Sequence, residues 1–264
     1  MKPKLTIITP SFNQAPFVER TLRSVLDQGY ERLEYLVIDG GSTDGSVDVI
    51  RRYEERLAWW VSEPDRGQTD ALNKGLRRAT GDVVAYINSD DYYLPGAFDA
   101  AIAALESSDA LWVTGIARFE DANGRFGSLW RPHLPKGGRY WWILDSWGVP
   151  QAATFWRREA FERFGHFRED MHYVFDTEFG LRLALAGELP ALLDRELAVR
   201  VEHEDAKSWN PVPFRREMDR FLELHEASLS GRERVLMKVM AALRRVGLFR
   251  LTSAASRVYR RARP

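Results

Sequence analysis

Short apolar runs alternate with longer amphipathic segments through the first half of the chain. The apolar runs are rich in β-branched and aromatic residues and predict strands at residues 5–9, 34–38, 59–61, 82–87 and 111–116. Between them, apolar side chains recur at helical spacing, for example Val18, Leu22 and Val25, and later Phe98, Ala101 and Ile102. Strands that alternate with helices predict βαβ units. The expected fold class is α/β, with a Rossmann-like, doubly wound, mostly parallel sheet and flanking helices.

A polar segment follows each of the first four predicted strands. These segments read TPSFNQ, DGGSTDGS, SEPDRGQTDALNKG and NSDD along the chain. Ligands of doubly wound sheets bind outside the carboxyl ends of the strands, so these segments should line one site. Glycines 40, 41 and 45 would let the backbone approach a ligand closely. The pattern indicates a nucleotide site, although it contains neither the GxGxxG fingerprint nor a GxxxxGK[ST] phosphate loop.

Two adjacent carboxylates, Asp90 and Asp91, end the buried strand at 82–87. Like charges repel each other, and a carboxylate beside an apolar core loses hydration. The loop that carries them should therefore open to water or hold a cation.

The second half of the chain follows a different pattern. Residues 117–157 interrupt the alternation and contain five of the nine tryptophans, which indicates an ordered aromatic excursion rather than a linker. Helices are predicted at 158–164 and 176–186, a strand at 196–201, and helical structure from 214 onward.

Composition narrows the class of protein. The chain has 264 residues, enough for one large domain or for a domain of about 200 residues with an appendage. It has no cysteine, which excludes disulfides, thiolate metal sites and a cysteine nucleophile. No apolar stretch approaches the roughly 18 residues of a membrane span, and the N-terminus resembles a first strand rather than a signal peptide. We expect a cytoplasmic protein.

The net charge is zero but unevenly distributed. From residue 232 onward ten Lys and Arg face the single Glu233, so the rest of the chain carries a net charge of −9. The basic tail also has an apolar stripe. It could lie on an anionic membrane surface at the inner face of the cytoplasmic membrane, or pack on the main domain with a solvated basic face. The sequence leaves both alternatives open.

Several motifs in unbroken order resemble one known family. They include IITPSFNQAPFVERTLRSVLDQ, LEYLVIDGGSTDGS, EPDRGQTDALNKGL, GDVVAYINSDDYYLPGAF, QAATFWRREAFERFGHF and FDTEFGLRLA. Together they span about residues 4–208 and resemble family 2 glycosyltransferases, the inverting, nucleotide-sugar-dependent enzymes with the GT-A fold. The resemblance implies a nucleotide-sugar donor, a glycan or lipid-linked acceptor, Mg²⁺ or Mn²⁺ as cofactor, and no nucleic-acid partner.

The resemblance also implies roles for individual residues of the donor site. Asp39 would accept a hydrogen bond from the base, although an Asp before Gly is also a common turn residue. Asp90 would contact the ribose, with helix capping as the alternative. The remaining donor-binding residues would be Thr9, Pro10, Ser11, Asp65, Arg66 and Gln68.

The implied metal ligands are Asp91, from the DXD signature, and His203, for which a hydrogen-bonded surface residue is the alternative. Asn88 stands where the first aspartate of DXD often lies. A divalent cation held by hard carboxylate oxygens would neutralise the charge that builds on a leaving diphosphate.

Asp176 is the implied catalytic base, because an acceptor hydroxyl needs a carboxylate to remove its proton. Phe175 replaces the glutamate of the common Glu-Asp pair, Glu178 is a rival base, and an Asp at a helix start is often only a cap. Trp141, Trp142 and Gln151 are candidate acceptor-binding residues, with core or lid positions as the alternative for the tryptophans.

The sequence therefore predicts an inverting glycosyltransferase that uses a nucleotide sugar, most simply a UDP-sugar, and metal-assisted single displacement. A GT-A catalytic domain would occupy 1–210, with a donor half at 1–116 and an acceptor and base half at 117–210. A basic, amphipathic helical C-terminal extension would occupy 211–264. The alternatives are a non-catalytic nucleotide-sugar-binding protein and a sugar nucleotidyltransferase.

Overall fold

The structure is a computed structural model that describes residues 1–132, 149–204, 206–207, 211–228, 230–231, 234–235 and 238–239. None of the helices in these ranges has the length and apolar character needed to span a bilayer. Most of the basic tail from 232 onward lies outside the described residues, as do Trp141 and Trp142.

The N-terminal half alternates strands and helices as predicted. Its elements are β1 (Leu5–Ser11), α1 (Ala15–Leu26), β2 (Leu33–Asp39), α2 (Ser46–Arg51), η1 (Glu54–Arg56), β3 (Trp59–Ser62), α3 (Gln68–Arg78), β4 (Val83–Tyr86) and α4 (Ala97–Glu106). The order β3-β2-β1-β4 is parallel throughout. Their carboxyl ends therefore meet at one edge of the sheet, where the polar segments were expected.

The second half makes the sheet mixed. It contains β5 (Tyr92–Tyr93), β6 (Trp112–Asp121), β7 (Phe126–Trp130), η2 (Gln151–Ala153), β8 (Thr154–Arg157), α6 (Arg158–Phe164), α7 (Phe175–Leu185), β9 (Ala191–Glu202), α8 (Pro211–His225) and η4 (Glu226–Ser228). β8 is antiparallel to both β4 and β6, whereas β9 is parallel to β6. The apolar pattern of the sequence did not predict β5, β7 and β8, because each is short and lacks an apolar run of its own.

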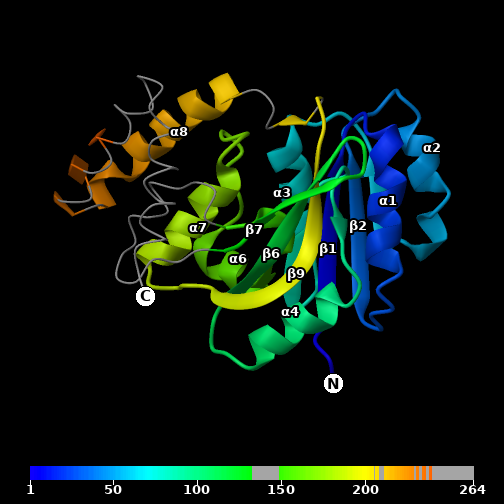
Figure 1. Cartoon of the computed structure of the whole chain (residues 1–264), viewed down its shortest axis with the longest axis horizontal. Coiled ribbons are helices and arrows are strands. Elements are labelled where there is room, and N and C mark those ends of the chain that lie inside the picture. Colours follow the sequence, from blue (N-terminus) through cyan, green and yellow to red (C-terminus); the bar gives the residue numbers. More distant parts are fainter. Residues whose placement is uncertain are drawn as a thin grey trace.

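Helices cover both faces of the sheet (Figure 1). Buried residues of β1 and β2 pack against α1, α2 and α4 on one face, and against α3, α6 and α7 on the other. Gly75 of α3 lies so close to β1 that an added Cβ would meet Ile8 at 2.6 Å. This close approach places the first turn of α3 beside the carboxyl edge of the sheet.

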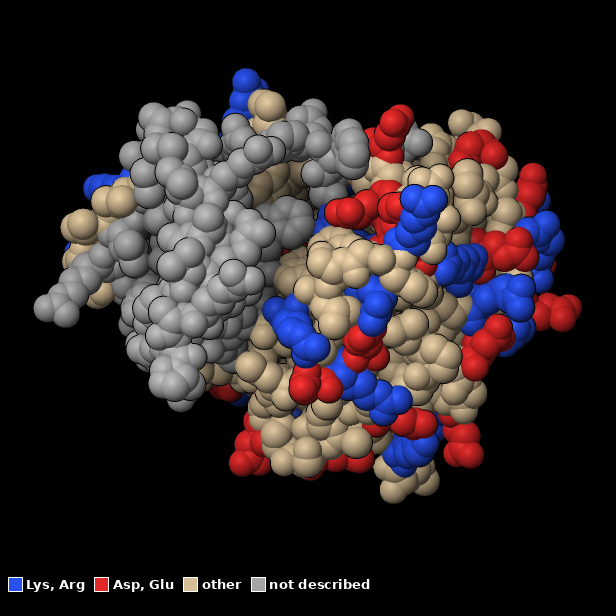
Figure 2. All heavy atoms as spheres, in the orientation of Figure 1, with Lys and Arg blue, Asp and Glu red and all other residues tan. Residues whose placement is uncertain are grey.

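Helix α8 is attached to the main core. Met218 and Phe221 are 1% and 0% exposed and belong to the same apolar cluster as the residues of α3, α6 and α7. Residues 211–228 therefore pack on the sheet and helices that precede them. On the face drawn in Figure 2, Lys and Arg side chains of the described residues are interspersed with Asp and Glu.

A buried carboxylate stabilises the edge of the sheet opposite the polar segments. Glu34 accepts hydrogen bonds from Lys4 Nζ (2.6 Å), Thr6 Oγ1 (2.6 Å) and the N–H and hydroxyl of Thr80 (2.8 and 2.6 Å). Burial alone would raise the pKa of Glu34, but these hydrogen bonds outweigh it and lower the pKa from 4.5 to about 2. Ionised Glu34 therefore contributes stability that is present above its unfolded pKa and is lost as the pH falls toward 2.

Replacement of Glu34 by Gln should lower the free energy of unfolding by about 3 kcal/mol at neutral pH. The difference from wild type should shrink as the pH falls from 4.5 toward 2. Urea denaturation across this range measures it, with the exposed neighbour Glu31→Gln as the control. Equal losses in the two variants would contradict the assignment.

Candidate active site

The register of the parallel strands brings the first polar segments together. Ser11 of β1 lies opposite Asp39 of β2, and Asp39 lies opposite Ser62 of β3. Asp39 is fully buried, and its Oδ2 accepts hydrogen bonds from the N–H groups of Gly41 (3.0 Å) and Ser42 (2.8 Å) and from Ser62 Oγ (2.7 Å). The Ser42 hydroxyl donates to Oδ1 at 2.5 Å. Asp39 thus holds the turn after β2 in place.

Three other predicted donor-binding residues, Thr9, Pro10 and Ser11, are buried at the end of β1. Thr9 Oγ1 lies 3.0 Å from the hydroxyl of Tyr35, so the Thr9 side chain is engaged within the sheet. Ser11 Oγ is buried and has no hydrogen-bond partner in the described part of the chain. Pro10 lies between them, opposite Ile38. Ser11 is therefore the member of this group with hydrogen-bonding capacity to spare.

The loop after β3 is held by its own hydrogen bonds. Asp65 Oδ1 accepts the N–H of Gly67 at 2.7 Å, and Asp65 also lies against Gly40, where an added Cβ would meet its Oδ2 at 2.8 Å. Arg66 is exposed and pairs with Asp70 (3.2 Å) and Glu169 (2.5 Å). The loops after β2 and β3 therefore form one unit.

The side chains of Asp90 and Asp91 have different hydrogen-bond partners. Asp90 Oδ2 lies 3.1 Å from His203 Nε2, and the His203 ring stacks on Phe17 with centroids 4.3 Å apart. Asp91 instead accepts the backbone N–H of Val201 at 3.0 Å and the amide of Asn88 at 3.4 Å. Burial, with the charge of Asp90 as a second cause, raises the pKa of Asp91 well above its usual value.

The chemistry of the Asp90–His203 pair fits a divalent cation. Carboxylate oxygen and imidazole nitrogen are both ligands of Mn²⁺, and Mg²⁺ is commonly bound by one or two carboxylates together with phosphate oxygens. No cluster of three or more His, Cys, Asp or Glu side chains suited to a metal occurs among the residues that the structure describes. Asp90 and His203 could supply two ligands to a cation here.

Gln68 connects the loop that carries Asp90 to Lys207 of the C-terminal segment. From the first turn of α3, its amide nitrogen donates to Asn88 Oδ1 at 2.6 Å. Its amide oxygen accepts a hydrogen bond from Lys207 Nζ at 2.9 Å. Asn88, which departs from the DXD pattern, is thus held by its neighbours on both sides, Gln68 and Asp91.

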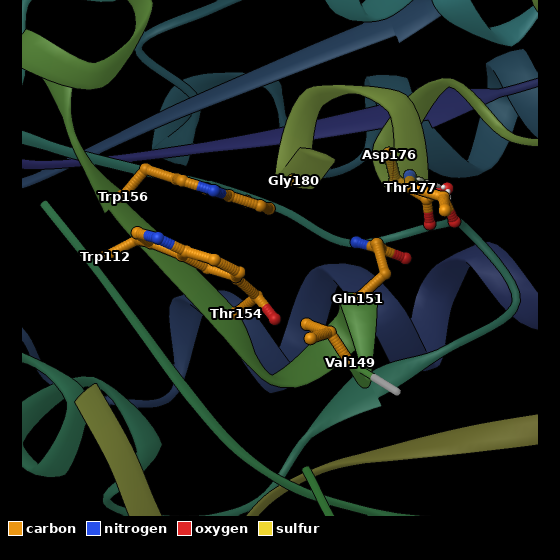
Figure 3. A pocket seen from close by; sticks show the side chains of 8 residues that line it. All are labelled: Trp112, Val149, Gln151, Thr154, Trp156, Asp176, Thr177 and Gly180. Carbon is orange, nitrogen blue, oxygen red and sulfur yellow. Dashed lines mark hydrogen bonds between the residues drawn. The ribbon is translucent and has the colours of Figure 1, made fainter. Parts of the chain in front are cut away.

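Asp176 lies in the first turn of α7 and lines a pocket with Gln151, Thr177 and two tryptophans (Figure 3). Its Oδ1 accepts the N–H of Thr177 at 2.7 Å. Burial raises the pKa of Asp176, and the Thr177 hydrogen bonds and the positive charge of Lys207 oppose that rise only in part. A carboxyl with a raised pKa is a stronger base once it is ionised.

The rest of the pocket is formed by the sheet and by η2. The rings of Trp112 and Trp156 lie on one side of it and Asp176 with Thr177 on the other (Figure 3). Gln151 is positioned by a hydrogen bond from its amide nitrogen to the carbonyl of Tyr86 at 2.8 Å. The predicted base and one predicted acceptor residue are therefore brought together.

The neighbours of Asp176 face elsewhere. Glu178 is 1% exposed, accepts a hydrogen bond from Arg182 at 2.9 Å and lies 3.3 Å from His225 Nε2. Phe175 packs against the rings of Tyr86 and Phe167. Glu178 is therefore a buried ion-pair residue on the side of α7 that faces α8, and it does not line the pocket.

Two charged residues near Asp176 were not predicted from the sequence. Lys207 follows His203 by four positions, and Glu217 lies in α8. Neither belongs to a recognisable motif, and only the folded chain brings them to the start of α7.

The chain is similar in sequence to known glycosyltransferases. Residues 6–165 match the family described as Glycosyl transferase family 2. An uncharacterized glycosyltransferase of Mycobacterium tuberculosis is 34% identical over 191 residues, which cover 70% of this chain and 71% of that protein. The putative teichuronic acid biosynthesis glycosyltransferase TuaG of Bacillus subtilis is 37% identical over 120 residues, 44% of this chain and 48% of that protein.

Two groups of solved structures share the fold. S. aureus TarS 1–349 in complex with UDP-GlcNAc aligns with a TM-score of 0.68 and 19% identity, over 90% of this chain and 70% of that one. The mannosyltransferase PcManGT from Pyrobaculum calidifontis, in complex with GDP-Man and Mn²⁺, aligns with a TM-score of 0.66 and 21% identity, over 100% and 77%.

The sheet and its flanking helices are those of a GT-A glycosyltransferase, as in these solved structures. The sequence match narrows the class, and the chain belongs to glycosyltransferase family 2. The fold class, the family and the enzyme class predicted from the motifs are confirmed. The binding-module and nucleotidyltransferase alternatives have no support.

Proposed function

We propose that this glycosyltransferase transfers a sugar from a nucleotide-sugar donor, a UDP-sugar in the first instance, to a hydroxyl of a glycan or lipid-linked acceptor with inversion. One observation carries the proposal. Asp90 lies with His203 on one side, and Asp176 lies in its pocket on the other. Between them Gln68 bonds both Asn88, in the loop that carries Asp90, and Lys207, whose positive charge acts on Asp176. A donor placed between the two centres would meet a diphosphate-binding side and a base-bearing side.

Within this proposal different side chains bind different parts of the donor. Ser11, whose hydroxyl has no hydrogen-bond partner among the described residues, and the turn held by Asp39 would bind the nucleoside. Asp90 and His203 would hold Mg²⁺ or Mn²⁺, which when bound supplies positive charge to the leaving diphosphate. Asp91 was the metal ligand expected from the motif, but its hydrogen bonds to Val201 and Asn88 favour a role in fixing the loop.

Asp176 is the proposed general base. It would take the proton from the acceptor hydroxyl as that oxygen attacks the sugar carbon and the diphosphate leaves. One base and one displacement give inversion at the sugar carbon. Gln151, held by the Tyr86 carbonyl, is placed to orient the acceptor in the same pocket.

The nature of the donor and the acceptor is supported by similarity. TarS was solved with UDP-GlcNAc and PcManGT with GDP-Man and Mn²⁺, and TuaG is named for teichuronic acid biosynthesis. These names support a nucleotide-sugar donor and an acceptor in polysaccharide biosynthesis.

The test is release of nucleoside diphosphate from a panel of UDP-, GDP- and dTDP-sugars, with acceptor extracts and with Mn²⁺ or EDTA. We expect release from one nucleotide class, dependent on Mn²⁺ and on acceptor. Full activity in EDTA would contradict the role proposed for Asp90 and His203. Release that needs no acceptor would contradict the transfer reaction.

A further inference from the structure

Three consecutive backbone amides immediately before α7 converge on one carboxylate. Glu217 of α8 accepts the N–H of His172 at 2.6 Å, the N–H of Tyr173 and the N–H of Val174 at 2.8 Å. Charge-assisted hydrogen bonds of this kind are about twice as strong as neutral ones. They use N–H groups at the entry of α7 that the helix cannot satisfy internally. Glu217 therefore fixes the backbone turn from which Asp176 enters the pocket.

Helix α8 is anchored well enough to transmit that constraint. Met218, the residue after Glu217, is buried in the core with Phe221. Arg220 on the same helix contacts Asp170, donating to its carbonyl at 3.1 Å and to its carboxylate at 2.6 Å. Two side chains of α8 thus hold the segment 170–174 from outside.

A second residue of the C-terminal segment reaches the same place. The Lys207 ammonium donates to the carbonyl of His172 and lies 5.0 Å from the ring centroid of Tyr173. The residue is exposed as a whole, but burial of its ammonium lowers the pKa of Lys207 to about 8, against the opposing charges of Glu217 and Asp176. At neutral pH it therefore remains mostly protonated and places a positive charge near the Asp176 carboxylate.

Both residues lie outside residues 6–165, the range over which the family model matches. We propose that Glu217 and Lys207 are positioning residues for the general base: Glu217 holds the turn that aims Asp176, and Lys207, bonded to the carbonyl of His172, holds the same turn and places its positive charge there. The inference rests on the proposed role of Asp176. It gives Glu217 of α8 a positioning role in catalysis.

The first test compares Glu217→Gln with Glu223→Gln, an exposed glutamate on the same helix. The glutamine amide presents N–H groups where the backbone N–H groups need acceptors. We expect hydrogen–deuterium exchange at His172, Tyr173 and Val174 to accelerate at least about tenfold, and kcat to fall about 10- to 100-fold with donor KM unchanged. Glu223→Gln should match wild type in both respects.

Unchanged exchange, or unchanged kcat, in Glu217→Gln would overturn the role of Glu217. If that variant does not fold, Glu217→Asp serves instead, since its shorter carboxylate cannot reach all three N–H groups and should give the same two changes in milder form. The exchange measurement needs no substrate, so its failure is distinguishable from failure of the proposed reaction.

The second test concerns the charge of Lys207. In the described part of the chain, the titratable groups that act on Asp176 or Lys207 include Tyr86 of β4, Tyr173 and Glu217 of α8. Loss of the positive charge in Lys207→Met should raise the pKa of Asp176 further, so the acid limb of the kcat/KM profile should move to higher pH. Lys207→Arg should restore the wild-type position of this limb.

An acid limb that stays in place in Lys207→Met would overturn the role of Lys207. The same result follows if Lys207→Met and Lys207→Arg shift it equally. The Asp176 carboxyl can also be titrated by NMR in the substrate-free protein, which keeps this outcome independent of turnover.

Discussion

Replacement of Asp176 by Asn should reduce kcat about 10²- to 10⁴-fold and at the same time stabilise the protein at neutral pH. The loss of activity follows from removal of the base. The gain in stability follows from burial, which raises the pKa of Asp176 and so makes its ionised form unfavourable in the folded state. Turnover by nucleoside diphosphate release and thermal unfolding measure the two effects.

The pH dependence of this stability has a definite sign. Between the unfolded and the raised folded pKa of Asp176 the folded state binds more protons, so wild-type stability falls as the pH rises through that window. The stability advantage of Asp176→Asn should therefore be largest above the folded pKa and disappear below the unfolded one. Asp48→Asn, at an exposed first-turn position of α2, is the control and should change neither activity nor this profile.

Retention of more than about a tenth of the activity by Asp176→Asn would contradict its role as the base. Loss of donor affinity in the same variant would point to a binding defect. Donor affinity measured by calorimetry separates these outcomes. Asp176 lies in the pocket with Gln151, and not with Ser11 and Asp39, which are proposed to bind the nucleoside.

The second large effect is expected at Asp90. Asp90→Asn should lower turnover about 10²- to 10³-fold and weaken Mn²⁺ binding in the presence of nucleoside diphosphate, because the amide oxygen carries no full negative charge for the ion. His203→Gln should weaken Mn²⁺ binding in the same direction. Calorimetric titration of Mn²⁺ into the protein with nucleoside diphosphate measures both.

The adjacent carboxylate provides the matched control. Asp91→Asn should keep most of the Mn²⁺ affinity, because Asp91 is turned toward Val201 and Asn88 while Asp90 faces His203. If instead Asp91→Asn abolished Mn²⁺ binding and Asp90→Asn did not, the assignment from the DXD pattern would be right and the one from geometry wrong.

Residues such as Ile7, Val37 and Leu72 show why much of the fold was accessible from the sequence. The periodic spacing of such apolar residues indicates which side of a strand or helix is buried. In a parallel βαβ series the carboxyl ends of the strands then lie at one edge of the sheet. The short strands β5 and β8 were not predicted, because two to four residues carry too little periodicity. Their pairing partners are also distant in sequence: β5 pairs with β9, and β8 pairs with β4 and β6.

The sequence by itself determined the family. It also predicted the edge of the sheet that carries the site, with Asp176 and the adjacent carboxylates Asp90 and Asp91 as candidate site residues. Only the tertiary structure decided which carboxylate meets His203 and which is buried against Val201, because neighbouring side chains in a loop have no periodicity that assigns their directions. It also brought Lys207 and Glu217 to the entry of α7, since contacts between distant segments are set by packing rather than by local pattern.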